Sequence, residues 1–281
     1  MTRAHPKATA MFPVPVRRPL DEAREFGPEQ FGASGPADWC PGCGHAEALE
    51  ALKAACSGLG VANKDLLCVA GTGCAGSLPE ALLSYGMRVP AGRALPVALG
   101  AKLVNPDLFV IAVGGEGETA GPGLGHLMHA ARLNADLTFL MLDSGSRGFP
   151  ADERTFEPAM LALAAGATFA ARVLAQDSAA SAAVMAQAVQ HRGFSFVHVL
   201  GSCPPGAENL RLQLTGSAAP SPQGGDGTTR ADAAPLGVLF DAANVPSYEE
   251  FDPVLSRRGA AVRENLGLSP KDIAELEACF K

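Results

Sequence analysis

Two kinds of hydrophobic segment alternate along this chain: short runs that are apolar throughout, and longer stretches in which apolar residues recur every three or four positions. The short runs predict strands buried on both faces, at 65–70, 108–113, 137–142 and 195–200, with a further strand near 169–174. The periodic stretches predict helices at 44–59, 77–85, 92–103, 123–134, 156–165 and 178–191. Strands and helices in this alternation predict an α/β fold with a doubly wound, mostly parallel sheet.

The segments outside this core differ in composition. Residues 1–35 are rich in Pro, Gly and charge and predict an extended N-terminal arm, which leaves the α/β domain at 36–212. No large apolar residue occurs over 215–235, so a flexible linker is expected at 213–235. A C-terminal tail at 236–281 follows, and it ends in an expected helix at 270–280.

Composition and charge narrow the possible function classes. The 281 residues are 47% apolar and only 18% charged, a profile typical of a tightly packed α/β enzyme. The net charge of −7 argues against non-specific binding to nucleic acid. No apolar run approaches the ~18 residues of a membrane span, and the first residues lack the apolar segment of a secretory signal. We therefore expect a cytoplasmic protein with neither a nucleic-acid nor a membrane partner.

Four of the seven cysteines lie at tight turns with Gly or Pro beside them. Cys40 and Cys43 form a C-x-x-C pair, Cys74 ends a Gly-Thr-Gly-Cys turn, and Cys203 follows the last core strand. Exposed thiolates on tight backbone, with N–H groups free to face sulfur, are the setting of an iron–sulfur cluster. The four cysteines therefore indicate a protein that transfers electrons.

Two other chemistries could use the same cysteines. A thioredoxin-type pair should follow a buried strand, and residues 31–38 before Cys40 do not have a strand pattern. A structural zinc site usually repeats the C-x-x-C pair, whereas Cys74 and Cys203 are single. The remaining cysteines are expected to be inert thiols: Cys56, Cys68 and Cys279.

Candidate chemical groups gather just after the predicted strands, at the edge where α/β sheets bind ligands. The acidic, glycine-rich segment 114–118 follows one strand, and Asp143 with Ser144 follows the next. A lone Gly-x-Gly turn is weak evidence for a site by itself. His126 and His129 are one helical turn apart, and we expect helix-surface groups because nothing supplies further metal ligands.

Several runs resemble the β subunits of 2-oxoacid:ferredoxin oxidoreductases. In order along the chain, the similar runs are 39–45, 92–106, 125–132, 193–200, 235–238 and 246–250. The resemblance implies a thiamine diphosphate-binding fold and the oxidative decarboxylation of a 2-oxoacid, of the pyruvate or 2-oxoglutarate type, with coenzyme A taking the acyl group. It also implies that electrons pass to ferredoxin through a [4Fe–4S] cluster ligated by Cys40, Cys43, Cys74 and Cys203.

The resemblance further implies a Mg²⁺ ion that grips the diphosphate, held by an Asp and an Asn. The matching positions here are Glu116 and Ser144, so both ligands are changed although each keeps an oxygen. Glu is one methylene longer than Asp, and Ser is shorter than Asn. Further residues expected at the cofactors are Gly42, Gly73, Cys74, Gly92, Arg93, Gly115, Gly117, Glu118 and Gly148.

Other departures from the family lie in the same region. Ala91 stands where the family has His, residues 75–77 lack its basic residue, and acidic Asp152 and Glu153 stand near the position of a Lys. One hypothesis is an active β subunit, and the other is a non-catalytic paralogue that keeps the cluster as an electron relay or a structural subunit. A zinc-stapled scaffold is a third. We find no pyrimidine-binding domain in this sequence, so a separate α subunit is expected to supply it.

Overall fold

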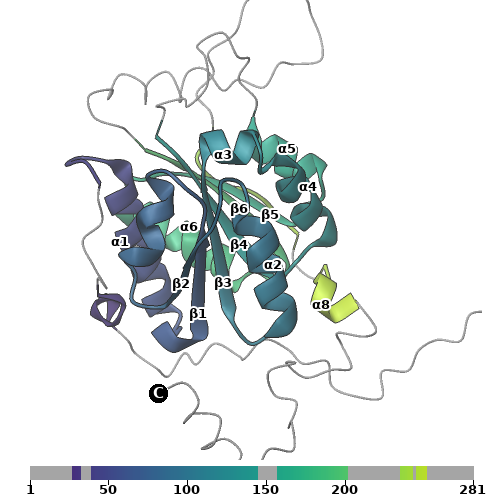
Figure 1. Cartoon of the computed structure of the whole chain (residues 1–281), viewed down its shortest axis with the longest axis horizontal. Coiled ribbons are helices and arrows are strands. Elements are labelled where there is room, and N and C mark those ends of the chain that lie inside the picture. The colour runs from purple at the N-terminus through teal and green to yellow at the C-terminus, as the bar shows by residue number, and fades with distance from the viewer. Residues whose placement is uncertain (1–26, 33–38, 145–156, 202–234, 243–244, 252–281) are drawn as a thin grey trace, which may run out of the picture.

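The computed structural model describes residues 27–32, 39–144, 157–201, 235–242 and 245–251. A seven-stranded sheet in the order β2-β1-β3-β4-β6-β5-β7 forms its centre (Figure 1). Every neighbouring pair is parallel except β5 and β7, which are antiparallel. The strands are β1 (Leu66–Ala70), β2 (Tyr85–Arg88), β3 (Phe109–Gly115), β4 (Leu137–Asp143), β5 (Phe169–Leu174), β6 (Phe194–Leu200) and β7 (Gly237–Asp241).

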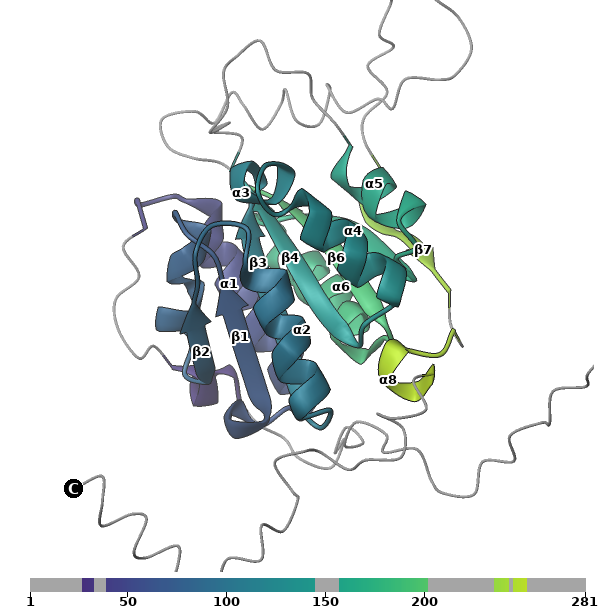
Figure 2. The same ribbon diagram turned by 45° about the vertical axis from the view of Figure 1, so that its right-hand side comes forward.

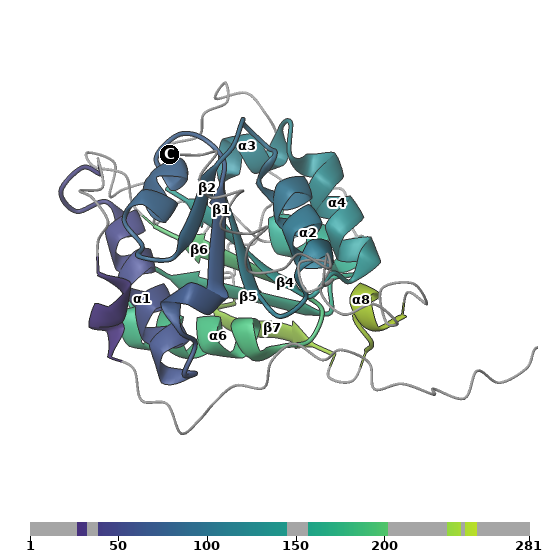
Figure 3. The same ribbon diagram turned by 60° about the horizontal axis from the view of Figure 1, so that its bottom comes forward.

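Helices cover both faces of the sheet (Figures 2 and 3). On one face α1 (Gly44–Gly58) packs against α6 (Ser178–Gln190). On the other lie α2 (Ala94–Val104), α4 (Leu124–Leu133) and α5 (Pro158–Ala164). The short elements are α3 (Glu116–Ala120), α8 (Tyr248–Phe251) and the 3₁₀ turns η1 (Pro28–Phe31), η2 (Asn63–Asp65) and η3 (Ala75–Glu80).

The central strands are apolar throughout because both of their faces are covered. In β3, Ile111 and Val113 belong to the cluster under α1 and α6, whereas Val110 and Ala112 belong to the cluster under α2 and α4. All four are at most 2% exposed. Alternate side chains of one strand therefore build two separate hydrophobic cores, which fix the sheet from both sides.

A buried charged cluster lies at the amino-terminal edge of the sheet, at the opposite end from α3. Lys102 Nζ is 2.9 Å from Asp136 Oδ2, and it also donates to the carbonyl oxygens of Pro106 and Leu108 at 2.9 Å each. Glu249 of α8 accepts a hydrogen bond from the Asp136 backbone N–H at 3.1 Å. Burial raises the pKa of Glu249, and the neighbouring Asp136 carboxylate raises it further. This cluster connects α8 to the sheet.

The structure confirms the doubly wound, mostly parallel sheet. The helix predicted at 77–85 is wrong: the chain forms η3 and then β2, an edge strand whose four residues are all exposed. The glycine-rich turn expected after β3 contains the short helix α3. The helix predicted at 270–280 and Cys279 lie outside the described residues. Among the helices that the structure describes, none is both long enough and apolar enough to span a bilayer.

Candidate functional site

The strand order changes direction between β1 and β3, because the chain leaves β1 toward β2 but leaves β3 toward β4. Open α/β sheets bind ligands at such a switch point, outside the carboxyl ends of the strands. The loop after β1 carries Cys74, and the segment after β3 carries Glu116 and Glu118. The predicted cofactor residues of these two segments therefore meet at one place.

The Cys40–Cys43 pair forms a tight turn directly before α1. The Cys43 N–H donates to the Cys40 carbonyl at 3.0 Å, and Gly42 has a φ of +77°. Pro at the second position and a left-handed Gly at the third match a type II turn. Cys40 is exposed, as expected for a ligand thiolate, but Cys43 is only 3% exposed. The turn thus presents one thiol to solvent and places the other against the start of α1.

The Trp39 side chain connects the two cysteine loops. Its indole Nε1–H donates to the carbonyl oxygen of Cys74 at 2.8 Å, across 35 residues of sequence. Cys74 is exposed, and Gly73 before it has a left-handed φ of +69°. Because Trp39 directly precedes Cys40, the hydrogen bond places the loops of Cys40 and Cys74 side by side.

A histidine lies against the buried cysteine of the pair. Cys43 Sγ is 3.0 Å from His45 Nδ1, and the His45 ring centroid is 6.0 Å from that of Trp39. Burial lowers the pKa of His45, which favours the neutral imidazole. A neutral imidazole has one N–H, which can donate to a Cys43 thiolate. Hydrogen bonds to ligand sulfur are one of the means by which proteins tune the potential of a cluster.

The start of α1 also contacts the chain that follows β6. A Cβ atom added at Gly201 would lie 3.3 Å from Gly44 Cα, and the Gly201 N–H donates to the Asp143 carbonyl at 2.7 Å. A small pocket with about 150 Å³ of empty space lies here, and its lining includes His45 and Asp143. Cys203, two residues beyond Gly201, lies outside the described residues.

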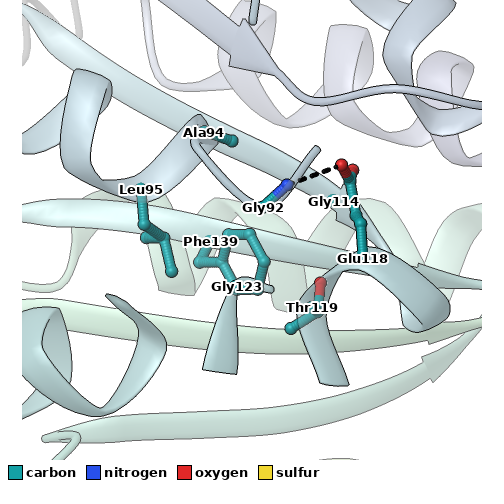
Figure 4. Close-up of a pocket in the computed structure, with 8 residues that line it drawn as sticks. All are labelled: Gly92, Ala94, Leu95, Gly114, Glu118, Thr119, Gly123 and Phe139. Atoms are coloured by element: carbon teal, nitrogen blue, oxygen red, sulfur yellow. Dashed lines mark hydrogen bonds between the residues drawn. The ribbon is translucent and has the colours of Figure 1, made fainter. Parts of the chain in front are cut away.

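The carboxylate of Glu118 accepts hydrogen bonds from two other loops and from the N-cap of its own helix, α3. Oε2 accepts from the backbone N–H of Thr72 and of Gly92, at 3.0 Å each, and Oε1 accepts from Gly115 at 3.1 Å. Figure 4 shows the bond to Gly92. Around this carboxylate there is little free space, since a Cβ on Gly71 would lie 2.0 Å from Oε2. The Glu118 carboxylate therefore binds backbone N–H groups of the protein itself.

Glu116 and Ser144 follow two neighbouring strands. In the β3–β4 register Gly115 pairs with Leu142, so Glu116 comes at the level of Asp143, one residue before Ser144. Both side chains are partly buried. A carboxylate and a hydroxyl are hard oxygen ligands, and such ligands suit Mg²⁺. The donor types at this edge therefore fit the ion that the sequence predicts.

Among the described residues, no three His, Cys, Asp or Glu side chains could hold one metal ion together. An iron–sulfur cluster and a zinc ion would both draw on Cys203 as well, which is not among those residues. The cluster ligands stay a prediction, and Gly148 lies outside the described residues, like Cys203.

The remaining titratable candidates lie as expected. Cys56 and Cys68 are fully buried core thiols, and burial raises the pKa of Cys56 to about 12. On α4, His126 is half-buried and His129 is exposed. Neither belongs to a cluster of metal ligands within the part of the chain that the structure describes. The two cysteines are therefore core residues, as the sequence predicts.

Sequence reasoning missed a buried polar network beside the site. His198 Nε2 is 3.0 Å from Asp143 Oδ2, and Arg172 Nε–H donates to His198 Nδ1 at 3.4 Å. Arg172 also forms an ion pair with Glu157, at the start of α5. The available signal was an Arg and a His inside otherwise apolar strands, where charged residues are rarely buried without partners. The network fixes Asp143, the residue before Ser144.

Several known proteins are similar to this chain in sequence or in fold. Residues 71–199 match the family model "Thiamine pyrophosphate enzyme, C-terminal TPP binding domain". The chain is 35% identical, over 189 residues, to the 2-oxoacid:ferredoxin oxidoreductase subunit beta of Saccharolobus solfataricus; the match covers 59% of this chain and 62% of that subunit. It is 32% identical, over 189 residues, to the 2-oxoglutarate synthase subunit KorB of Archaeoglobus fulgidus, with 60% and 70% covered.

The chain spans less than two thirds of the Saccharolobus subunit's length. A solved structure extends the similarity to almost the whole chain. It is the 2-oxoglutarate:ferredoxin oxidoreductase from Magnetococcus marinus with 2-oxoglutarate, coenzyme A and succinyl-CoA bound. The TM-score is 0.72 at 26% identity, and the match covers 95% of this chain and 99% of that chain.

Proposed function

The chain belongs to the family of 2-oxoacid:ferredoxin oxidoreductase β subunits, and we propose that it acts as one in the oxidative decarboxylation of a 2-oxoacid. In this proposal it binds Mg²⁺ and thiamine diphosphate at the β1–β3 switch point and a [4Fe–4S] cluster through its four turn cysteines. Its partners are an α subunit with the pyrimidine-binding domain, and ferredoxin as electron acceptor. Its substrates are a 2-oxoacid and coenzyme A, and it works in the cytoplasm.

The observation that carries this proposal is the meeting of cysteine-bearing loops at the switch point. The Trp39 indole bonds the Cys74 carbonyl, and Gly201 packs on Gly44, the residue after Cys43. In the sequence only Ser202 stands between Gly201 and the predicted ligand Cys203. These contacts support a shared cluster close to the acidic segment after β3.

Thiamine diphosphate, when bound, supplies the chemistry that removes the carboxyl group of a 2-oxoacid. In the proposal, Glu116 and Ser144 hold the Mg²⁺ ion. A Cβ at Gly73 would meet nothing within 4 Å. Gly73 thus leaves the backbone beside Cys74 open to a diphosphate, as in other anion-binding loops.

A second candidate is a non-catalytic subunit that keeps the cluster as an electron relay. The changed Mg²⁺ ligands, Glu116 and Ser144, favour it, because Mg²⁺ demands near-octahedral geometry and both side chains differ in length from the family's ligands. The cysteine loops are unaffected by these changes. Binding of thiamine diphosphate therefore decides between the two candidates.

The first experiment is anaerobic purification of the chain. We expect brown protein with about four irons per chain and an EPR signal on reduction. Colourless protein with one zinc per chain would overturn both electron-transfer candidates. The second experiment is a calorimetric titration with Mg²⁺ and thiamine diphosphate in the presence of the α subunit. Saturable binding supports the catalytic proposal, whereas its absence in cluster-loaded protein supports the relay.

A further inference from the structure

Glu118 connects the two segments that carry the predicted cofactor ligands. Thr72, one of its hydrogen-bond donors, lies 46 residues away in sequence and two residues before the predicted cluster ligand Cys74. Gly115, another donor, directly precedes the predicted Mg²⁺ ligand Glu116. One side chain therefore holds the cysteine loop after β1 against the acidic segment after β3.

The donors to Glu118 suit a side chain with two acceptor oxygens and no donor group. All three partners of Glu118 are backbone N–H groups, and an ionised carboxylate only accepts hydrogen bonds. Charge-assisted bonds of this kind are about twice as strong as neutral ones. A glutamine would keep one acceptor oxygen but turn its NH₂ group toward a backbone N–H, so at least one bond would be replaced by a contact between two donors.

The backbone around Glu118 has little freedom to move independently. The Gly123 N–H donates to the Glu118 carbonyl at 2.8 Å, and a Cβ on Gly92 would lie 2.5 Å from the Gly123 nitrogen. Gly92 itself has a left-handed φ of +70°. The start of α2 is thus fixed to α3 by close backbone contact as well as by the Glu118 carboxylate.

We propose that Glu118 is a positioning residue that sets the place of the cysteine loop relative to the diphosphate-binding segment, and thereby the affinity for thiamine diphosphate. It acts through the backbone N–H groups of Thr72, Gly92 and Gly115, so its effect on the cofactor is indirect. This inference rests on the proposed function. Figure 4 shows the Glu118 carboxylate directed at the Gly92 amide, beside a pocket with about 210 Å³ of empty space.

The first test needs no cofactor. Hydrogen–deuterium exchange of peptides that contain Thr72, Gly92 and Gly115 is compared between the wild-type chain, Glu118→Ala and Glu118→Gln. The control is Glu50→Gln, which removes the same charge from an exposed position on α1. We expect exchange at the three amides to rise at least about 10-fold in Glu118→Ala, since all three bonds are lost. Unchanged protection in Glu118→Ala would overturn the proposal.

The second test is the affinity for Mg²⁺ and thiamine diphosphate, measured by calorimetry on cluster-loaded protein with the α subunit. For Glu118→Ala we expect the affinity to fall by about 10- to 100-fold, the range for residues that orient a ligand-binding group without binding the ligand themselves. Formate should restore part of this loss, because a small carboxylate can occupy the space between the three amides. A general loss of folding would lower the melting temperature and would not respond to formate.

The two tests separate failure of the inference from failure of the proposed function. If the wild-type chain binds no thiamine diphosphate, the catalytic function fails, and the exchange measurement still decides whether Glu118 holds the loops. Lost protection with unchanged affinity would overturn the positioning role. Tighter binding by Glu118→Ala would also overturn it, because Glu118 would then compete with the diphosphate for the same amides.

Discussion

Two glutamates lie at opposite edges of the sheet, Glu118 at the carboxyl edge and Glu249 at the amino edge. Both accept hydrogen bonds from backbone N–H groups, but their surroundings differ. Glu118 has three N–H donors, two from other loops and one from the N-cap of its own helix. Glu249 has the Asp136 N–H and a second carboxylate, that of Asp136, close by. The pKa of Glu249 is raised by burial first.

The different surroundings of the two glutamates match the different roles that we propose for the two edges of the sheet. At the carboxyl edge, glycine-rich loops leave backbone and oxygen ligands near solvent, where a cofactor can reach them. At the amino edge, Lys102 and Asp136 are 1% and 3% exposed, so their charges serve only contacts inside the protein. We therefore expect loss of the buried ion pair at the amino edge to alter stability, and loss of an oxygen ligand at the carboxyl edge to alter binding.

The largest effect is expected from Lys102→Met. The substitution removes the cation beside Asp136 and the donor to two carbonyl groups. Breaking a buried ion pair from one side costs about 3–5 kcal/mol of folding free energy. Urea unfolding measures the loss, with Lys64→Met, at an exposed position, as the control. A loss as small as that of the control would contradict the assignment of this edge to stability.

At the carboxyl edge, Glu116→Ala is expected to weaken the binding of Mg²⁺ and thiamine diphosphate more than about 100-fold, beyond the range for groups that only support a ligand. Its free energy of unfolding without cofactor should match that of Glu50→Ala, an exposed substitution on α1. Calorimetry and urea unfolding of the two variants check this. Equal affinity in both variants would exclude Glu116 as a ligand.

Thr119→Val is expected to have a smaller effect, and to stabilise the fold rather than destabilise it. Thr119 is 3% exposed, and its Oγ1 has no hydrogen-bond partner within the described part of the chain. Removing an unpaired buried hydroxyl while keeping the shape of the side chain should stabilise the fold by about 1 kcal/mol. A thermal melt of the ligand-free chain measures this. A lower melting temperature would reveal that the hydroxyl binds a group in its pocket.

The smallest expected effect is a change with pH in the contribution of Glu249 to the free energy of unfolding. Because the folded-state pKa of Glu249 is raised above its ordinary value of 4.5, the folded state binds this proton more tightly than the unfolded state. Its contribution to stability is therefore complete below pH 4.5 and is lost as the pH rises through the folded-state pKa. The unfolding free energy of wild type minus that of Glu249→Gln should fall as the pH rises. A difference that stays constant would contradict the raised pKa.

Periodicity predicted the buried elements well because burial on both faces leaves an uninterrupted apolar run, as in β3 and β4. It failed at β2, whose residues are all exposed and carry no alternation between a buried and an open face. It failed at α3 because five residues are too few to show a helical period. An exposed edge strand and a very short helix both lack the hydrophobic period from which such elements are predicted.

The candidate site likewise contains residues that the sequence could select and contacts that it could not predict. Cys40, Cys43 and Cys74 could be selected from turn chemistry, and Glu116 from its match to the family's Asp. The bonds of Glu118 to Thr72 and of Trp39 to Cys74 could not, because each joins residues more than 30 positions apart. Such pairs follow from the strand order, which a single sequence does not contain.

The bond between Trp39 and the Cys74 carbonyl has a practical consequence. The chain contains a single tryptophan, so its tryptophan emission comes from one known point beside two exposed thiols. A coloured iron–sulfur centre at that point would absorb the emitted light. Filling and loss of the centre would then be visible as dimming and recovery of the protein's own fluorescence, with no label attached.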